Sequence, residues 1–181
     1  MRDLVGVMNV LGTEAEGEKR QGITNFDEKK FKEVLGHFAT GVVIVTSVEK
    51  DSPVGFTCQS FISLSLSPPM VAFAPAKTST TWPRVAKSGL FCANILSTEQ
   101  QYLAERFAIS GGEKFKGVNW HYGPYGSPIL DGSLCSVECA IAFVHEAGDH
   151  ELVVANVLDI EASQGSPLLF YRGQYSRFAT Y

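Results

Sequence analysis

The sequence predicts a mainly β protein, an antiparallel barrel with a few short flanking helices. β-branched and alternating apolar runs recur along the chain, three short segments have helical spacing, and the strands rarely alternate with helices. Parallel sheets need that alternation, whereas successive strands joined by turns favour antiparallel barrels. At 181 residues and 45% hydrophobic, the chain is long enough for one core, so we expect a single folded domain.

The domain is expected to begin after an N-terminal arm. Residues 1–24 mix Gly, Glu, Lys and Thr without a sustained period. Such a segment buries too little apolar surface to offset the conformational entropy that ordering would cost. We therefore expect a flexible or partner-docking arm at 1–24 and the folded domain at 25–181.

The first element of the domain is predicted to be an amphipathic helix. Phe31, Val34, Leu35 and Phe38 recur at helical spacing, and two acidic residues lie where the helix dipole favours anions. Gly41 is expected to end this helix.

The remaining elements are mostly strands, predicted from β-branched runs bounded by turn residues. The first two are expected to form a hairpin. The strands are expected at residues 42–46, 53–58, 70–74, 90–96, about 133–146, 150–161 and 167–178.

Two short helices interrupt this series of strands. One has Pro83 near its start and Gly89 past its end, and the other opens with a capping box at Thr98–Gln101 and runs through Phe107. The stretch from 110 to 133 is too long for a simple turn, so we expect a functional or subunit-contacting loop there.

The composition argues against several classes of protein. Nineteen acidic and fifteen basic residues give a mildly negative chain without a basic stripe, so we expect no nucleic-acid partner. Apolar runs are shorter than the roughly 20 residues that span a bilayer, and the N-terminus lacks a signal pattern. We expect a cytoplasmic protein without a membrane partner. The four cysteines have no Cys-x-x-Cys spacing and are interpreted as reduced core thiols, so no metal is expected.

Two nucleotide-binding motifs, GxGxxG and GxxxxGK[ST], are absent, so a nucleotide would have to be held in another way. The segment Lys77-Thr78-Ser79-Thr80-Thr81 follows a predicted strand and precedes a predicted helix. One ammonium and four hydroxyls at such a point suit a phosphate, and a solvated turn is the alternative.

Three other segments carry polar groups at strand ends. Thr57–Phe61 suits the edge of a planar heterocycle, although an ordinary strand crossing would use the same residues. His150 enters an apolar strand after a Gly-Asp turn, and Arg172 follows two aromatic residues. A histidine there could orient a nicotinamide or tune a flavin, and an arginine could meet a phosphate, but each is also common in structural roles.

Several of these segments, taken in order, resemble the flavin reductase family with the FMN-binding split-barrel fold. The resemblance runs from about Phe26 to Phe178 and is closest to short reductase components of two-component monooxygenases. It rests on Phe38-Ala39-Thr40-Gly41-Val42, Pro53-Val54-Gly55-Phe56-Thr57-Cys58-Gln59-Ser60-Phe61, Ser65-Leu66-Ser67-Pro68-Pro69, Gly148-Asp149-His150 and Phe170-Tyr171-Arg172-Gly173.

The resemblance implies an antiparallel Greek-key split barrel and assigns roles to individual residues. Gln59 and Ser60 would contact the flavin ring and ribityl chain, and His150 would lie beside the nicotinamide. The phosphate wall would comprise Ala74, Pro75, Lys77, Thr78, Ser79, Thr80 and Thr81, with Arg106 as a further contact or a surface ion pair. The nicotinamide side would comprise Pro53, Val54, Gly55, Phe56, Thr57, Cys58, Phe170, Tyr171, Arg172 and Gly173.

The resemblance also implies an activity, cofactors and partners. Hydride would pass from NADH or NADPH to FMN or FAD, and reduced flavin would diffuse to a monooxygenase acting on aromatic, phenolic or steroid-type substrates. The reductase would be a homodimer. The sequence leaves open the choice of flavin, although a shortage of basic residues for a 2′-phosphate favours NADH.

Two other functions remain open from the sequence. A flavin-binding electron-transfer protein could use the same barrel without steady turnover of NADH. A hydrolase built on Cys58 or Ser60 with His150 or His145 is a second alternative, although the chain lacks a GxSxG nucleophile motif.

Overall fold

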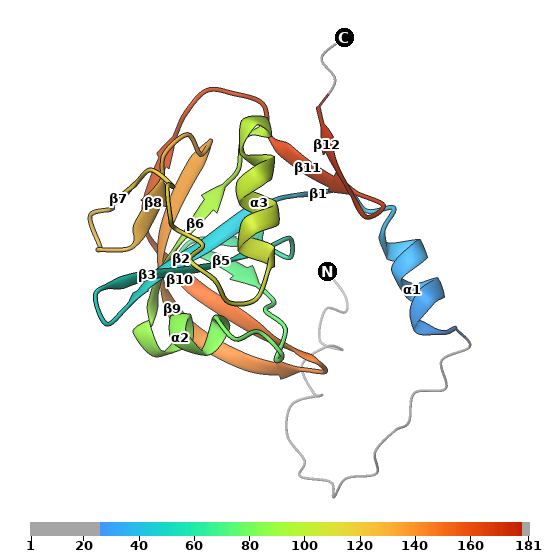
Figure 1. The fold of residues 1–181 in the computed structure, drawn as a ribbon. Coiled ribbons are helices and arrows are strands. Elements are labelled where there is room, and N and C mark those ends of the chain that lie inside the picture. Colours follow the sequence, from blue (N-terminus) through green and yellow to red (C-terminus); the bar gives the residue numbers. More distant parts are fainter. Residues whose placement is uncertain (1–25, 179–181) are drawn as a thin grey trace, which may run out of the picture.

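The structure is a computed structural model that describes residues 26–178 (Figure 1). The arm predicted at 1–24 lies outside the described residues. A curved seven-stranded sheet forms the body, in the order β3-β2-β6-β9-β10-β5-β4 with antiparallel neighbours. Its strands are β2 (Val43–Glu49), β3 (Ser52–Cys58), β4 (Ile62–Leu66), β5 (Pro69–Phe73), β6 (Leu90–Ile95), β9 (Cys135–Ala147) and β10 (His150–Ala162).

Two small sheets and four helical segments complete the described fold. One small sheet has the order β1-β11-β12, and the other pairs β7 with β8. The strands are β1 (Thr40–Gly41), β7 (Trp120–Tyr122), β8 (Pro128–Leu130), β11 (Leu168–Tyr171) and β12 (Gln174–Arg177). The helices are α1 (Glu28–Leu35), α2 (Trp82–Ser88), the 3₁₀ turn η1 (Thr98–Gln100) and α3 (Gln101–Ala108).

The barrel is split because its two edge strands follow each other in the chain without pairing. β3 and β4 form opposite edges of the seven-stranded sheet, yet only Gln59, Ser60 and Phe61 separate them. Four steps along the chain span at most about 14 Å, so the sheet must curl until the end of β3 lies near the start of β4. We call this gap the seam.

Two apolar clusters fill the structure and share β2. The larger lies inside the barrel around Phe73, whose ring centroid is 5.2 Å from that of Phe91 and 5.7 Å from that of Trp82. The smaller packs α3 against the outside of the sheet and includes Phe107. Val43 and Val45 belong to the first cluster, and Ile44 belongs to the second. The alternation of side chains along a strand places them on opposite faces, which explains the uninterrupted β-branched run.

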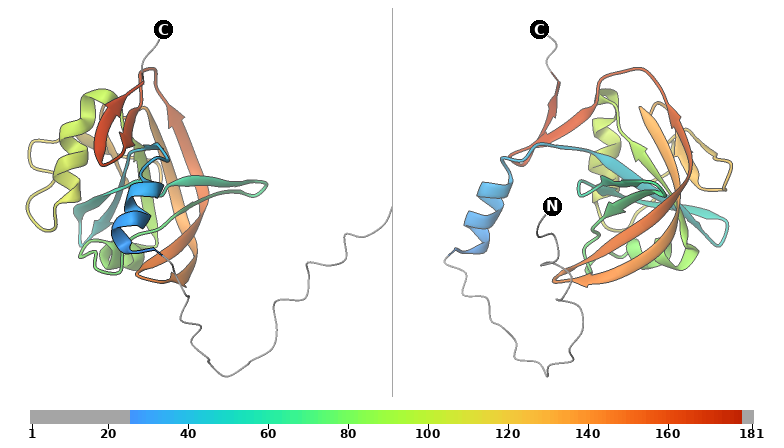
Figure 2. Two further views of the ribbon diagram at one scale, coloured as in Figure 1. Left: turned by 90° about the vertical axis from the view of Figure 1, so that its right-hand side faces the viewer. Right: turned by 180° about the vertical axis from the view of Figure 1, so that it is seen from behind.

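Helix α1 forms as predicted, with the Asp27 side chain accepting a hydrogen bond from the Lys30 backbone N–H at 2.7 Å. The helix ends at Leu35, with Gly36 as its C-cap, so the predicted end at Gly41 is wrong. None of its residues is buried, and Val34 and Leu35 are each more than half exposed. Figure 1 and the rear view in Figure 2 show α1 standing apart from the barrel.

Several strand predictions need correction. β4 was not expected as a strand, and the predicted loop at 110–133 contains the β7–β8 hairpin. The last predicted strand is a hairpin of β11 and β12, because Arg172 and Gly173 both adopt positive φ and turn the chain. The capping box lies one residue earlier than expected, between Ser97 and Gln100.

The loop between β7 and β8 is held by a buried carboxylate on β9. Glu138, only 1% exposed, accepts hydrogen bonds from the backbone N–H groups of Tyr125 and Ser127, both at 3.1 Å. These bonds give hydrogen-bond partners to a polar side chain that would be costly to bury alone. The loop is therefore tied to the barrel wall.

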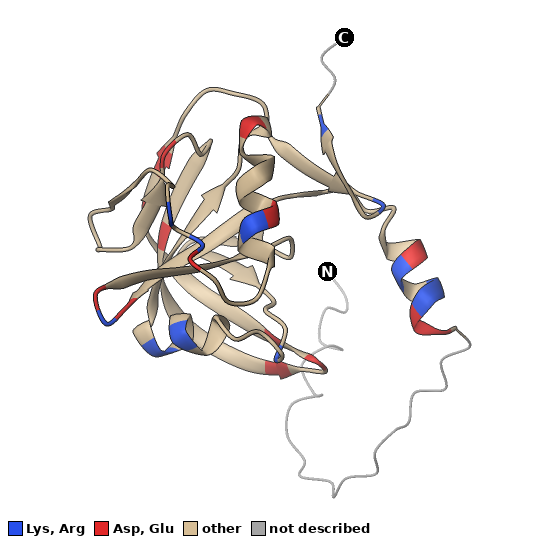
Figure 3. Ribbon diagram, in the orientation of Figure 1, with Lys and Arg blue, Asp and Glu red and all other residues tan. Residues whose placement is uncertain are grey.

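Charged residues of both signs are spread over the described elements, as Figure 3 shows. No helix within 26–178 is long and apolar enough to cross a bilayer. The four cysteines are free thiols, as predicted; three are buried and Cys135 is half-buried.

Candidate functional site

A recess of about 700 Å³ opens at the seam, where β3 ends and β5 ends. Its size is within the usual range of about 300–1,000 Å³ for small-molecule sites. No Lys, Arg, Asp or Glu lines it. The lining residues are Phe56, Thr57, Cys58, Gln59, Ser60, Ala74, Pro75, Ala76, Ser79, Ala108, His150, Phe170 and Tyr175.

Ser60 joins the two sides of the seam at the edge of this recess. Its hydroxyl donates to the carbonyl of Ala74 at 3.1 Å and accepts from the N–H of Ala74 at 2.8 Å. Ala74 directly follows β5, while Ser60 lies in the three-residue link after β3. The two hydrogen bonds therefore fix the position of Ser60, one of the two residues predicted to contact the flavin.

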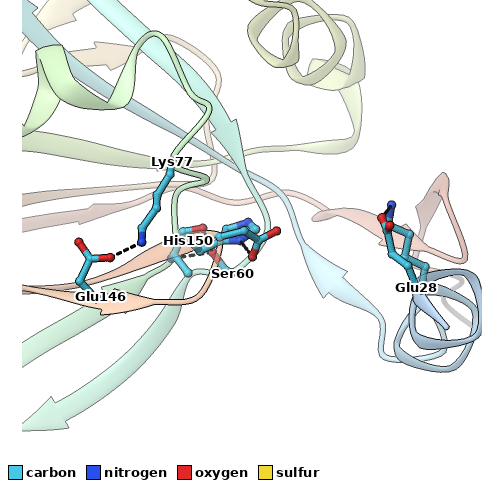
Figure 4. Close-up of polar contacts among 8 residues, drawn as sticks. Glu28, Ser60, Lys77, Glu146 and His150 are labelled. Atoms are coloured by element: carbon cyan, nitrogen blue, oxygen red, sulfur yellow. Dashed lines mark hydrogen bonds and ion pairs between the residues drawn. The ribbon is translucent and has the colours of Figure 1, made fainter. Parts of the chain in front are cut away.

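His150 is held in the recess by Asp149, which precedes it on the β9–β10 turn, and by backbone pairing with Ala76. Its Nδ1 lies 2.8 Å from Oδ1 of Asp149, and this hydrogen bond is the main cause that lowers the pKa of the Asp149 carboxyl. The backbone of His150 forms a bridge with Ala76. A carboxylate on Nδ1 orients the ring and leaves Nε2 for another partner. Figure 4 labels His150 and Ser60, both of which line the recess.

The geometry gives no support to a hydrolase built on Cys58 or Ser60. Burial raises the pKa of the Cys58 thiol, and its hydrogen-bond neighbour is the Ser60 hydroxyl at 3.3 Å rather than a histidine. A nucleophilic thiol needs a lowered pKa or an adjacent base. His145 lies on β9, exposed and stacked on Phe143, outside the lining of the recess.

A second cleft of about 560 Å³ adjoins the recess and contains other predicted residues. Pro53, Val54 and Gly55 line it, together with Thr80 and Thr81. Gly55 leaves room for the neighbouring helix, because a Cβ there would lie 2.9 Å from the ring of Phe107. The predicted nicotinamide and phosphate segments are thus each divided between two cavities.

A third cavity lies between α1 and β11. It shares Gln59 and Phe170 with the recess and is also lined by Arg172 and Gly173. The N–H of Arg172 donates to the carbonyl of Gly36 at 2.9 Å, which holds the β11–β12 turn against the end of α1. The predicted segment Phe170–Gly173 therefore reaches the recess at one end only.

Four predicted binding residues lie outside all three of these cavities: Lys77, Thr78, Arg106 and Tyr171. The Lys77 ammonium pairs with Glu146 on the β9–β10 hairpin (Figure 4), and Arg106 donates to the carbonyl of Lys116 at 2.9 Å. Both cations therefore have partners within the protein. Their contact with a cofactor phosphate remains a prediction.

Tyr175, Arg84 and Lys114 are among the lining residues of these cavities that sequence reasoning missed. Tyr175 enters the recess from β12, while Arg84 and Lys114 enter the second cleft from α2 and from the segment after α3. A hairpin predicted at the Arg172–Gly173 turn would have paired Tyr175 with Phe170, as the structure does. Nothing in the sequence links Arg84 to Lys114, because only the fold brings them together.

An antiparallel split barrel with a mostly neutral recess at its seam defines the class of flavin-binding split-barrel proteins. The chain belongs to the flavin reductase family, because the model described as "Flavin reductase like domain" matches residues 35–179. The predicted family, the split-barrel fold and the prediction of a flavin reductase are thereby confirmed.

Individual relatives agree with the family match. The reductase subunit HsaB of a flavin-dependent monooxygenase from Rhodococcus jostii is 45% identical over 165 residues, covering 91% of this chain and 85% of the relative. The structure of nitrilotriacetate monooxygenase component B from Mycobacterium thermoresistibile is 45% identical, with a TM-score of 0.82 over 84% of this chain and 87% of that one. The NADH:FAD oxidoreductase SgcE6 from Streptomyces globisporus, in complex with NAD and FAD fragments, is 33% identical, with a TM-score of 0.81 over 84% and 93%.

Proposed function

We propose that this flavin reductase binds its flavin ring in the recess at the seam, reduces it with NADH and supplies it to a separate monooxygenase. The observation that carries the proposal is the recess itself, a cavity lined by Ser60 and His150 and by no Lys, Arg, Asp or Glu, in a chain of this family. The chemistry of the bound groups is hydride transfer from the nicotinamide to the flavin.

The lining of the recess suits a planar ring system, such as a flavin, that gains negative charge when it is reduced. Aromatic and small side chains surround the cavity, and Gln59 and Ser60 add polar groups at one wall. No carboxylate lines it, so negative charge that develops in the cavity meets no like charge at contact distance. The chain's part is to hold the two rings together, which can lower a barrier by up to about 7–11 kcal/mol.

The nicotinamide is proposed to enter from the side of His150 and Phe170. These residues lie on β10 and β11, and the third cavity continues outward from Phe170. His150 would orient the nicotinamide through Nε2, because Nδ1 is engaged by Asp149. We propose NADH as the donor, which is also the donor in the name of SgcE6.

The partner is proposed to be an oxygenase that uses reduced flavin. HsaB is named as the reductase subunit of a monooxygenase, and the recess opens to solvent at the seam. We propose that reduced flavin leaves by this opening and diffuses to an oxygenase for aromatic, phenolic or steroid-type substrates. A cytoplasmic location fits such an exchange.

The chain is further proposed to act as a homodimer. α1 has no buried residue, and a free helix of this length is marginal in water, so it needs an apolar partner. β4 presents Ile62, Leu64 and Leu66, each about half exposed or more, on a hairpin that projects from the barrel (Figure 2). A second copy of the chain would supply cover for both surfaces.

The proposed dimer implies that substitutions at two exposed isoleucines, Ile62 and Ile160, have different effects on self-association. Ile62→Glu in β4 should weaken self-association at least about 10-fold, because a charge would be buried in an apolar contact. Ile160→Glu in β10, at a residue that is 71% exposed, should leave the dimer intact. Sedimentation equilibrium measures both. A wild-type chain that stays monomeric at all concentrations would contradict the proposal.

The proposed reaction is tested by mixing the purified protein anaerobically with FMN or FAD and with NADH or NADPH. We expect catalytic loss of the oxidised-flavin absorbance near 450 nm, a property of the flavin itself, with NADH the better donor. Flavin binding without bleaching would favour the electron-transfer alternative. Flavin that never exchanges during turnover would contradict diffusible delivery to an oxygenase.

A further inference from the structure

The residue that follows His150 is tied to the start of α2 by a side-chain hydrogen bond. The indole Nε1–H of Trp82 donates to a carboxylate oxygen of Glu151, which is half-buried. Trp82 is the first residue of α2 and is 3% exposed, with its ring packed against that of Phe73. A buried indole N–H needs an acceptor, and Glu151 provides it. The bond therefore connects the interior cluster to the first residues of β10.

Glu151 and His150 project from opposite faces of β10. Side chains alternate along a strand, and Val153, two residues after Glu151, belongs to the interior cluster. Glu151 therefore lies on the interior face at the end of the barrel, while His150 lines the recess. A bond that holds Glu151 in place also fixes the backbone from which the imidazole projects.

Trp82 and Glu151 are also bonded through their backbones to the wall of the recess. The N–H of Glu151 donates to the carbonyl of Pro75 at 3.0 Å, and the N–H of Trp82 donates to Oγ of Ser79 at 3.1 Å. Pro75, Ser79 and His150 line the recess. Trp82 and Glu151 are absent from the lining of all three cavities. They therefore support the recess from behind without facing a bound molecule.

The position of Glu151 is unfavourable for a carboxylate on grounds of stability alone. It pairs in register with Glu146 on β9, so two carboxylates lie opposite each other. Like charges directly opposite in a sheet are destabilising. Each has a partner of its own, Lys77 for Glu146 and Trp82 for Glu151. A neutral residue at 151 would avoid the repulsion, so stability does not account for the carboxylate.

We propose that Trp82 and Glu151 are positioning residues for the reduction of flavin by NADH, because their hydrogen bond holds His150 where it meets the nicotinamide. The inference rests on the proposed function, which places the nicotinamide beside His150. Neither residue touches a reactant, and both act through the backbone of β10. A displacement of about 1 Å at the reacting groups can cost up to about 100-fold in rate, so a bond outside the recess can control the reaction.

The test removes either partner of the bond and measures anaerobic reduction of the flavin by NADH. Trp82→Phe, which keeps an aromatic ring, and Glu151→Leu should each lower kcat/KM for NADH about 5- to 10-fold, while flavin dissociation constants change less than about threefold. Glu151→Gln keeps an acceptor oxygen for the indole and should stay within about threefold of the wild type. The double variant Trp82→Phe/Glu151→Leu should lose no more than either single variant, because both changes remove the same bond.

Val85→Ala is the matched control for lost packing. Val85 lies in the same helix as Trp82, is fully buried and belongs to the same interior cluster, but it takes no part in the bond. The variant should lower Tm, because it leaves a cavity, and keep kcat/KM within about twofold. A loss of kcat/KM equal to that of Trp82→Phe would overturn the inference, since lost packing would then explain both.

The environment of the His150 imidazole provides a second readout, which does not depend on catalysis. Its NMR cross-peak, assigned by its absence in His150→Ala, should shift in Trp82→Phe and in Glu151→Leu. It should stay in place in Glu151→Gln, which removes the same charge, and in Val85→Ala. In the His150→Ala background, Glu151→Leu should lower kcat/KM by less than about a further twofold, because the carboxylate acts through the imidazole.

Two further outcomes would overturn the positioning role of Glu151. One is an unmoved His150 cross-peak in Glu151→Leu. The other is a Glu151→Gln variant as impaired as Glu151→Leu, because an acceptor for the indole would then be of no use. An unchanged rate in His150→Ala would instead contradict the proposed nicotinamide site, and the cross-peak would still decide whether Trp82 and Glu151 position the imidazole.

Discussion

Replacement of His150 by alanine is expected to lower kcat/KM for NADH about 10- to 100-fold, while the dissociation constant of the flavin changes less than about threefold. The imidazole lines the recess, and its Nδ1 is fixed by Asp149 at 2.8 Å. Loss of one oriented polar contact to a reactant costs about 1–3 kcal/mol, and a 10- to 100-fold loss, about 1.4–2.7 kcal/mol, lies within these limits. Anaerobic stopped-flow reduction at varied NADH concentration measures the effect.

His145 provides the matched control for this prediction. It lies on the same β9–β10 hairpin, but it is exposed, stacks on Phe143 and is not among the residues of the recess. His145→Ala should therefore leave kcat/KM within about twofold. Equal losses in the two variants would show that the hairpin matters as a whole. An unchanged His150→Ala would remove that residue from the proposed nicotinamide site.

Replacement of Phe73 by alanine is expected to lower the free energy of unfolding by about 3–5 kcal/mol, the usual cost of such a cavity. Phe73 is 1% exposed and packs against Phe56, Trp82 and Phe91 inside the barrel. For a chain of this length, such a loss lowers Tm by roughly 6–20 °C. Urea unfolding followed by circular dichroism, together with a thermal scan, measures both quantities.

Phe143 on β9 is the control for Phe73. Its side chain is 57% exposed, so truncation to alanine removes little buried area and should change the unfolding free energy by less than about 0.5 kcal/mol. Similar losses at the two positions would contradict the interior cluster as the main source of stability.

Much of the fold could be predicted because local patterns specify it. The spacing of apolar residues revealed α1, and the Asp27 cap confirms its start. The end of α1 was missed because Gly36 can end a helix as well as Gly41 can, and the structure has Gly36 as the C-cap, where its carbonyl accepts a hydrogen bond from the Arg172 N–H. β4 was missed because its alternating residues remain exposed and lie before a Pro-Pro turn.

The candidate site was predictable to a smaller extent. Gln59, Ser60 and His150 lie at strand ends, where polar residues stand out from apolar runs, and the structure places all three in the recess. Lys77 looked free in the sequence because its partner, Glu146, is 69 residues away. Strand order decides which basic and acidic side chains form ion pairs. The composition of the sequence does not reveal that order.

One strand connects the two apolar clusters of this protein. β2 presents Val45 to the barrel interior and Ile44 to the layer under α3, so neither layer can come apart without disturbing the backbone that supports the other. Two small hydrophobic layers would otherwise be free to melt at different temperatures. With a shared wall they form one cooperative unit, and the reductase should lose its structure in a single step.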